Sequence, residues 1–136
     1  MRFLATREHS RQELERKLLR HHPMHKVAQV LDELAAEGLQ SDQRFTRQYI
    51  HSRRSRGYGP VRIRAELGER GIASQLIAQT LETYDNADWQ QLMQEVARRK
   101  FGSDLAEDRR ELARRGRFLA SRGFPSWMIS DYLFRG

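Results

Sequence analysis

Arginine and glycine are interspersed in the stretch SRRSRGYGPVRIRAELGERGI, residues 52–72. This combination is typical of phosphate-binding loops, in which glycine N–H groups and basic side chains surround the anion. The stretch lacks G-x-x-x-x-G-K-[ST] and the third glycine of G-x-G-x-x-G, so neither nucleotide-binding motif is present. Gly57 instead predicts the end of one helix, and Gly59 with Pro60 predicts the N-cap and first residue of the next.

The arginines from Arg44 to Arg64 lie in a segment without acidic residues, because no Asp or Glu occurs between Asp42 and Glu66. Arg62 takes the third position of the predicted helix, where a cation is typically unfavourable by about 0.3–1 kcal/mol. We therefore expect free N–H groups at this helix start, together with the arginines, to bind a phosphate or carboxylate. Glutamate at position 62 is expected to spare the fold and weaken binding. A solvated basic face that only favours solubility is the alternative.

A second basic region runs from Arg98 to Arg117 and is diluted by four acidic residues, so a salt-bridged exposed helix is the stronger alternative there. The aromatic residues, Trp127 among them, are more often core residues than platforms for nucleobases. Tyr58 and Phe124 each follow an Arg-Gly pair and are the two rings to test for stacking on a nucleobase. The candidate binding surface combines both regions and consists of Arg53, Arg54, Arg56, Tyr58, Arg62, Arg64, Arg98, Arg99, Lys100, Arg114, Arg115 and Arg117.

Catalytic and metal-binding patterns are missing from the sequence. His21, His22 and His25 form the segment HHPMH, but the intervening proline and the lack of a carboxylate favour a loop or capping role over metal binding. No H-E-x-x-H or G-x-S-x-G motif and no catalytic carboxylate pair occurs. The sequence therefore predicts a protein that is not an enzyme and needs no metal or cofactor.

Composition narrows the class of partner. The formal net charge is +7 and the pI is about 10.5, which favours nucleic acid, an anionic membrane or an acidic protein surface as partner. The absence of cysteine excludes disulfides and thiolate chemistry. No signal peptide or membrane-spanning run is evident, so we expect a cytoplasmic protein without membrane contact. No heptad pattern of apolar residues continues for more than a few turns, and the net charge is high, so we expect a monomer.

Helical spacing of apolar residues recurs along the chain, and Ser10 with Glu13 has the pattern of a capping box, while Ser41 and Ser74 suit N-caps. The segments also resemble one another: SRQELERKL aligns with GPVRIRAEL at an offset of 49, and RGFPSWMISDYL aligns with RGYGPVRIRAEL at an offset of 66. These patterns predict an all-α, elongated array of three tandem three-helix repeats, with about nine short helices. We place the repeats at residues 1–38, 39–86 and 87–136.

The strings GYGPVRIRAEL, REHSRQELERKL, GLQSDQRF, RRKFG and RFLASRGF occur in an order that resembles the RecX family of bacterial recombination regulators. The resemblance implies a tandem helical-repeat fold and no catalytic residues. It also implies binding to RecA nucleoprotein filaments, limitation of filament growth, strand exchange and LexA-cleavage stimulation, and weak direct binding to single- or double-stranded DNA. Family members usually have a longer N-terminal extension than Met1 to Thr6, so we expect either a shortened first repeat or a start that is incompletely represented. The rival hypothesis is a stand-alone DNA-binding module whose helix from Pro60 recognises DNA.

Overall fold

The computed structural model describes residues 7–134, and this part of the chain is entirely helical, with no strand. Its helices are α2 (Arg11–Leu19), α3 (Met24–Ala36), α4 (Asp42–Ser55), α5 (Pro60–Glu69), α6 (Ser74–Leu81), α7 (Asn86–Phe101), α8 (Arg109–Arg122) and α9 (Ser126–Leu133). The predicted all-α class is confirmed, and the expected helix number is close to the eight described. The expectation of a shortened first repeat concerns residues 1–6, which lie outside the described residues.

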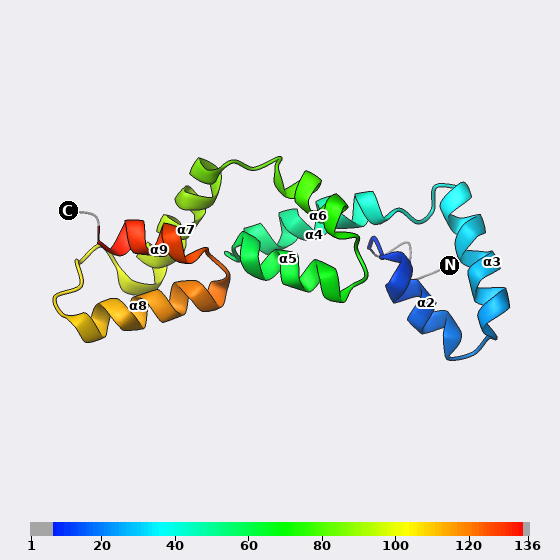
Figure 1. Cartoon of the computed structure of the whole chain (residues 1–136), viewed down its shortest axis with the longest axis horizontal. Helices are drawn as coiled ribbons and strands as arrows, with labels where there is room; N and C mark the ends of the chain where they lie inside the picture. The colour runs from blue at the N-terminus through cyan, green and yellow to red at the C-terminus, as the bar shows by residue number, and fades with distance from the viewer. Residues whose placement is uncertain (1–6, 135–136) are drawn as a thin grey trace.

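The helices form three groups that follow one another along the longest axis (Figure 1). The helix pair consists of α2 and α3, the middle triplet of α4, α5 and α6, and the last triplet of α7, α8 and α9. We call the contact between the helix pair and the middle triplet the first junction, and the contact between the two triplets the second junction. None of the helices in residues 7–134 is long and apolar enough to cross a membrane.

The predicted helix boundaries are mostly confirmed. Ser10 and Glu13 form a capping box at the start of α2, and the side chain of Ser41 caps α4. Ser74 was wrongly predicted as an N-cap: it is the first residue of α6, and Ala73 precedes it without a side-chain hydrogen bond. Each glycine predicted to follow a helix has a positive φ that other residues rarely adopt, namely Gly38, Gly57, Gly71, Gly102 and Gly123.

Two separate apolar cores hold the array together. The larger one is continuous across both triplets, with Phe45, Ile63 and Leu67 contributed by the middle triplet and Trp89 and Met128 by the last. The smaller core belongs to the helix pair and consists of the buried residues Leu14, Val27, Leu31 and Leu34. The second junction is therefore part of an apolar core, whereas the first junction separates two cores.

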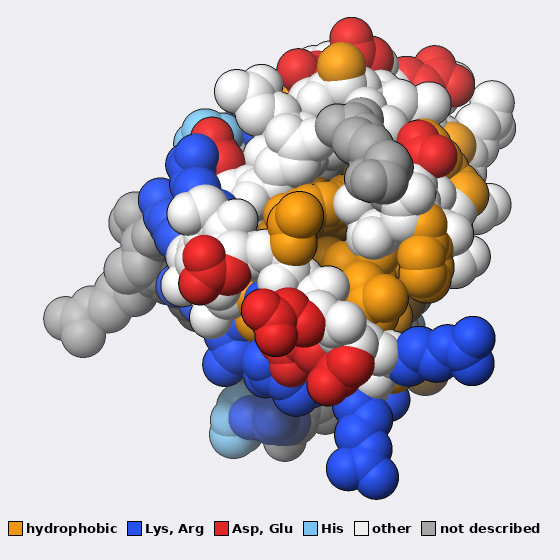
Figure 2. All heavy atoms as spheres, turned by 90° about the vertical axis from the view of Figure 1, so that its left-hand side faces the viewer, with side chains coloured by type: hydrophobic (Ala, Val, Ile, Leu, Met, Phe, Trp, Pro, Cys, Tyr) orange, Lys and Arg blue, Asp and Glu red, His pale blue; other side chains and the backbone are white. Residues whose placement is uncertain are grey.

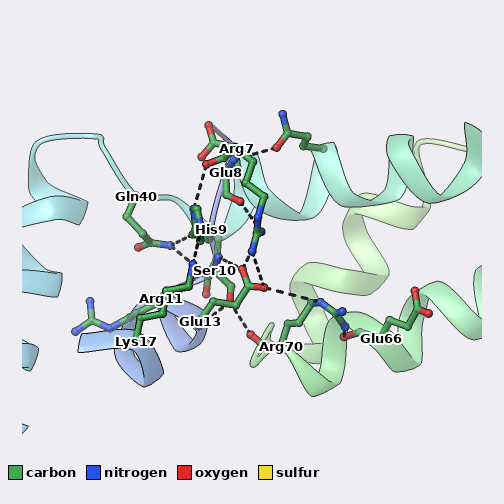
Figure 3. Close-up of polar contacts among 12 residues, drawn as sticks. Arg7, Glu8, His9, Ser10, Arg11, Glu13, Lys17, Gln40, Glu66 and Arg70 are labelled. Carbon is green, nitrogen blue, oxygen red and sulfur yellow. Dashed lines mark hydrogen bonds and ion pairs between the residues drawn. The ribbon is translucent and has the colours of Figure 1, made fainter. Parts of the chain in front are cut away.

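Polar contacts join the helix pair to the middle triplet at the first junction (Figure 3). The Ser10 hydroxyl donates to the backbone oxygen of Arg70 at 2.9 Å, and the backbone N–H of Arg11 donates to Asp42 Oδ1 at 2.8 Å. His9 is buried beside these contacts, and its Nδ1 lies 3.1 Å from the backbone oxygen of Arg7. Burial and the nearby charges of Arg7 and Lys17 lower the pKa of His9, so its imidazole is neutral at neutral pH.

Main-chain hydrogen bonds connect two loops at the second junction. The N–H of Gly59 donates to the carbonyl of Arg122 at 2.8 Å, and the N–H of Val61 donates to that of Gly123 at 2.9 Å. A Cβ atom at Gly59 would lie 2.6 Å from the carbonyl carbon and oxygen of Gly123. Glycine is therefore required at position 59 because the two backbones approach so closely.

The last triplet ends the array with a partly apolar surface. Figure 2 looks onto this end and shows apolar side chains gathered between charged ones. A groove between α8 and α9 is lined by Leu112, Ile129, Leu133 and Phe134, and the ring of Phe134 is largely exposed. This end therefore differs from the second junction, where the apolar surface is covered by another helix group.

Candidate functional site

A basic groove lies at the second junction, between the C-terminal end of α4 and helices α7 and α8. Its basic side chains are Arg54, Arg56, Arg99, Lys100 and Arg122, and its volume is about 570 Å³. We use the name basic groove for this set. The sequence placed the first four in two separate candidate regions, and the fold brings those regions together on one surface.

One carboxylate lines the basic groove, that of Glu95 on α7. Arg56, Arg99 and Lys100 are exposed to solvent. The groove therefore has an excess of positive charge, and a concave surface with charges of one sign concentrates the electric field and attracts anions.

Aromatic rings hold the two half-buried arginines of the groove. The guanidinium carbon of Arg54 lies 4.0 Å from the ring centroid of Tyr84 and 4.8 Å from that of Trp89. The guanidinium carbon of Arg122 lies 4.6 Å from the ring centroid of Tyr58. Arg122 was missing from the predicted site. The signal that could have identified it is its Arg-Gly-aromatic sequence, which repeats the one that begins at Arg56.

Glu66 engages two of the predicted site arginines. It accepts hydrogen bonds from Tyr49 Oη at 2.8 Å, from Arg53 Nε at 2.9 Å and from Arg62 Nε at 3.1 Å. Burial alone would raise the pKa of Glu66, but the hydrogen bonds from Tyr49, Arg62 and Arg53 outweigh it and lower the pKa below its ordinary value. Burial and the hydrogen bond to Glu66 raise the pKa of Tyr49 to about 12. Arg53 and Arg62 thus hold the fold together.

The position of Arg62 near the start of α5 has a structural cause. Besides pairing with Glu66, its Nη1 donates to the backbone oxygen of Ser121 at 3.1 Å and so connects the two triplets. Gly59 and Val61 donate their N–H groups to the last triplet, so the expectation of free N–H groups at this helix start is wrong for both. Glutamate at position 62 would stand beside Glu66, and we no longer expect it to spare the fold.

Arg114 and Arg115 are engaged by one acid of their own helix. Glu111 accepts from Arg114 Nη2 at 2.7 Å and from Arg115 Nε at 2.9 Å. Hydrogen bonds from Arg114 and Arg115 lower the pKa of Glu111 to about 2. Arg115 also donates to the backbone oxygen of Asp104. These contacts fit the salt-bridged alternative that the sequence offered for the second basic region.

The remaining predicted residues are spread over other surfaces. Arg98 and Arg117 are exposed outside the basic groove. Arg64 is also exposed and lines a different groove, which contains Val61 and Trp127. Within residues 7–134, Arg64 and Arg117 have no ion-pair partner, so they offer positive charge that is not committed to the fold.

The aromatic residues agree with the expectation only in part. Phe124 is buried in the large core, as expected for most of the aromatics, so it is not available to stack on a nucleobase. Tyr58 is half-buried, and the guanidinium groups of Arg53, Arg62 and Arg122 lie 4.0, 4.3 and 4.6 Å from its ring centroid. Trp127, expected in the core, is 50% exposed. The sequence did not predict which of these rings is buried, because all three lie near the end or the start of a helix.

The histidine segment lies around the turn between α2 and α3, where His21, His22 and His25 are exposed. Across residues 7–134, no three side chains of the metal-binding types come together in a way that suits a metal ion. The described part of the chain therefore gives its clearest chemical signal in the basic groove.

Comparisons with known proteins agree with the helical arrangement. Residues 41–81 match the family model described as RecX, second three-helix domain, and residues 87–133 match RecX, third three-helix domain. A regulatory protein RecX of Chromohalobacter salexigens is 48% identical over 125 residues, which cover 91% of this chain and 81% of the relative. One of Pseudomonas syringae pv. tomato is 44% identical over 134 residues, which cover 98% of this chain and 86% of the relative. The crystal structure of RecX from Lactobacillus salivarius has a TM-score of 0.82 at 19% identity and covers 98% of this chain and 88% of that chain, a similarity of fold.

Proposed function

Because this chain belongs to the RecX family of regulatory proteins, we propose that it binds RecA nucleoprotein filaments and limits their extension. Through this binding it reduces RecA ATPase activity, strand exchange and the stimulation of LexA cleavage. It thereby regulates recombinational DNA repair and the SOS response. The proposed action is non-enzymatic, requires no cofactor, and places the protein in the cytoplasm as a monomer built of repeats at residues 1–38, 39–86 and 87–136.

The observation that carries this proposal is the convergence of both basic regions on the basic groove. A nucleoprotein filament presents acidic protein side chains and DNA phosphates along its length, and both attract a concave cationic surface. The groove lies at the junction of two helix groups in an elongated array, so neighbouring helices on either side extend the contact along the filament. The rigid, core-filled second junction keeps the groove residues in fixed relative positions.

The direct test is a titration of the protein into RecA ATPase on single-stranded DNA, with DNA binding by the protein alone measured in parallel. We expect inhibition well below one regulator per RecA protomer, because blocking extension at one point affects many protomers. Inhibition that appears only when the protein saturates the DNA would instead support the stand-alone DNA-binding hypothesis and contradict the proposal.

A pair of charge-matched variants locates the surface. Arg56 and Arg99 are exposed groove residues without an ion-pair partner in residues 7–134, so R56E/R99E should lose inhibition by about tenfold or more without a change in melting temperature. The matched control R64E/R117E changes net charge equally but leaves the basic groove intact, and it should retain most of the inhibition. Equal loss in both variants would show that overall charge, and not the groove, determines binding.

A further inference from the structure

The two half-buried arginines of the basic groove lack the anionic partners that the other buried arginines of the molecule have. Arg53 and Arg115 are comparably buried, and each is paired with a carboxylate. Arg54 and Arg122 have neither a carboxylate nor a hydrogen-bond acceptor among residues 7–134, and the Nε atom of each is buried without a partner. Buried polar groups are usually satisfied, so two arginines at one groove, each with a buried Nε that has no partner and with no carboxylate paired to it in residues 7–134, indicate a missing anion.

The aromatic contacts explain how these cations are tolerated without an acid. A ring face stabilises a guanidinium through cation–π attraction, but it accepts none of the in-plane N–H donors. The rings of Tyr84 and Trp89 lie over Arg54, and those of Tyr58 and Phe118 lie over Arg122. The rings therefore fix the orientation of both groups, and the terminal Nη donors, which are not among the buried atoms, stay available to a ligand.

The backbone at Gly57 leaves room next to one of these groups. A Cβ atom at this position would lie 3.7 Å from Arg122 Nη2 and 2.9 Å from Val96 Cγ2, so a side chain here would crowd the groove wall. Arg56, Arg99 and Lys100 add exposed positive charge around the same cavity, whose volume exceeds that of a single anion. The cavity thus has oriented donors inside and exposed cations at its rim.

From this arrangement we infer that the basic groove is a phosphate-binding site, in which Arg54 and Arg122 donate hydrogen bonds to the phosphate oxygens. Phosphate suits the site better than a carboxylate because it offers more acceptor oxygens, and the planar guanidinium fork can bind two of them at once. The phosphate belongs either to a nucleic-acid backbone or to a free nucleotide, which share this chemistry. The inference names the ligand of the groove in the proposed function but is testable on the protein alone.

The Nε–H groups of the two arginines provide a direct reading by NMR. Inorganic phosphate is added to the full chain at constant ionic strength, with chloride as the reference anion, and the Arg Nε–Hε resonances are followed. We expect saturable shifts at Arg54 and Arg122 with phosphate and none with chloride. Equal responses to both anions, or shifts confined to exposed arginines, would overturn the inference.

Three further titrations identify the source of the phosphate. A single-stranded oligonucleotide, its abasic counterpart and a nucleoside triphosphate are titrated separately. Saturation by both oligonucleotides at lower concentration than by the nucleotide supports a backbone phosphate, because both oligonucleotides keep the phosphodiester. Tighter saturation by the triphosphate supports a nucleotide. If none of these ligands gives saturable shifts of the two resonances, the groove does not bind phosphate. This outcome would leave the proposed inhibition of RecA untouched.

Variants test the roles of the two arginines and of the groove acid. Arg54→Met and Arg122→Met keep a long side chain over the rings but remove the donors, and each should weaken phosphate binding by about tenfold or more. Glu95→Gln removes the carboxylate that lines the groove and should tighten binding about two- to fivefold without disturbing the fold. This opposite effect keeps the inference testable if the methionine variants fold poorly. An unchanged affinity in Glu95→Gln together with an unchanged affinity in a folded methionine variant would contradict it.

Discussion

The two junctions of the array are built from different interactions. At the second junction, a continuous apolar core and two main-chain hydrogen bonds join the triplets. At the first junction, side-chain hydrogen bonds and ion pairs connect two helix groups that have separate cores. Apolar burial and backbone contacts respond little to salt and pH, whereas exposed ion pairs are weak and screened.

This difference indicates that the array is stiff where the basic groove lies and adaptable near the helix pair. A site that must hold two guanidinium groups in place benefits from a junction that does not open. The polar first junction can change its geometry at lower cost, because few buried apolar contacts are lost when it opens.

Gly59→Ala should open the second junction. The added methyl group would overlap the backbone of Gly123 at 2.6 Å and the ring of Phe124 at 2.8 Å, and a backbone cannot move aside as a flexible side chain can. We expect a loss of about 2–3 kcal/mol in the free energy of unfolding, measured by urea denaturation. The φ of Gly59 is −92°, so the clash and not backbone strain is the cause.

Gly68→Ala is the matched control on the same helix. An added Cβ at Gly68 meets nothing within 4 Å, and alanine favours a helix over glycine by about 0.5–1 kcal/mol. This variant should therefore be slightly more stable than the natural chain. Similar destabilisation by both substitutions would show that the close approach of the two loops is not the reason for glycine at position 59.

Glu66→Gln should weaken the second junction less severely. It removes the charge that organises Arg53 and Arg62, and Arg62 also reaches the backbone of Ser121 across the junction. We expect a loss of about 1.5–2 kcal/mol at neutral pH. Because hydrogen bonds lower the pKa of Glu66 in the folded state, its contribution is present above the ordinary value of 4.5 and disappears as the pH falls through the folded pKa.

Denaturation of both proteins between neutral pH and about pH 3 checks this prediction. The stability of the natural chain should approach that of Glu66→Gln as acid protonates the carboxylate. A difference in unfolding free energy that stays constant with falling pH would show that the ionised form of Glu66 is not what stabilises the junction.

Mild acid and salt should destabilise the first junction alone, and should lower the free energy of opening it by less than about 1 kcal/mol. Burial first, then Arg7 and Lys17, lower the pKa of His9, while Glu13 raises it. An opened junction therefore takes up a proton more readily than a closed one, so its stability falls as the pH drops below about 6.5.

Hydrogen exchange measured by mass spectrometry separates the two junctions. Lowering the pH to about 5.5, after correction for intrinsic exchange rates, should accelerate exchange in α2 several-fold and leave α5 unchanged. Added salt should act in the same direction, because it screens ion pairs such as Arg44–Glu8. Equal acceleration in α2 and α5 would mean that the junctions do not differ in the way described.

The fold followed from local signals in the sequence, whereas the site depended on contacts between distant residues. Helix ends were predictable because glycines such as Gly57 terminate helices through their own backbone preferences. Arg62 pairs with Glu66 four residues further along the same helix, a spacing already visible in the sequence. The pairing of Arg53 was not predictable, because Glu66 reaches it only after α4 and α5 pack together. The same holds for Arg122, whose ring contacts come from both triplets.

One of the sequence alignments paired helices that are not equivalent in the fold. The alignment of residues 122–133 with 56–67 pairs α9 with α5, but α5 is the second helix of one matched family domain and α9 is the third of the next. The shared Arg-Gly-aromatic sequence is real, and it marks the two loops that contact each other at the second junction. Sequence likeness here reflects matching loops and not equivalent helices.

The polar first junction has a consequence for the nascent chain. During synthesis, α2 and α3 leave the ribosome before the segments that hold them in place. They are short helices with a small core of their own, and such helices are marginal in isolation. The acceptor of the Ser10 hydroxyl is made 60 residues later, so the helix pair acquires that contact only once α5 has emerged. The helix pair, which precedes the other described helices in the chain, is thus stabilised late, and until then its small core is open to proteases and chaperones.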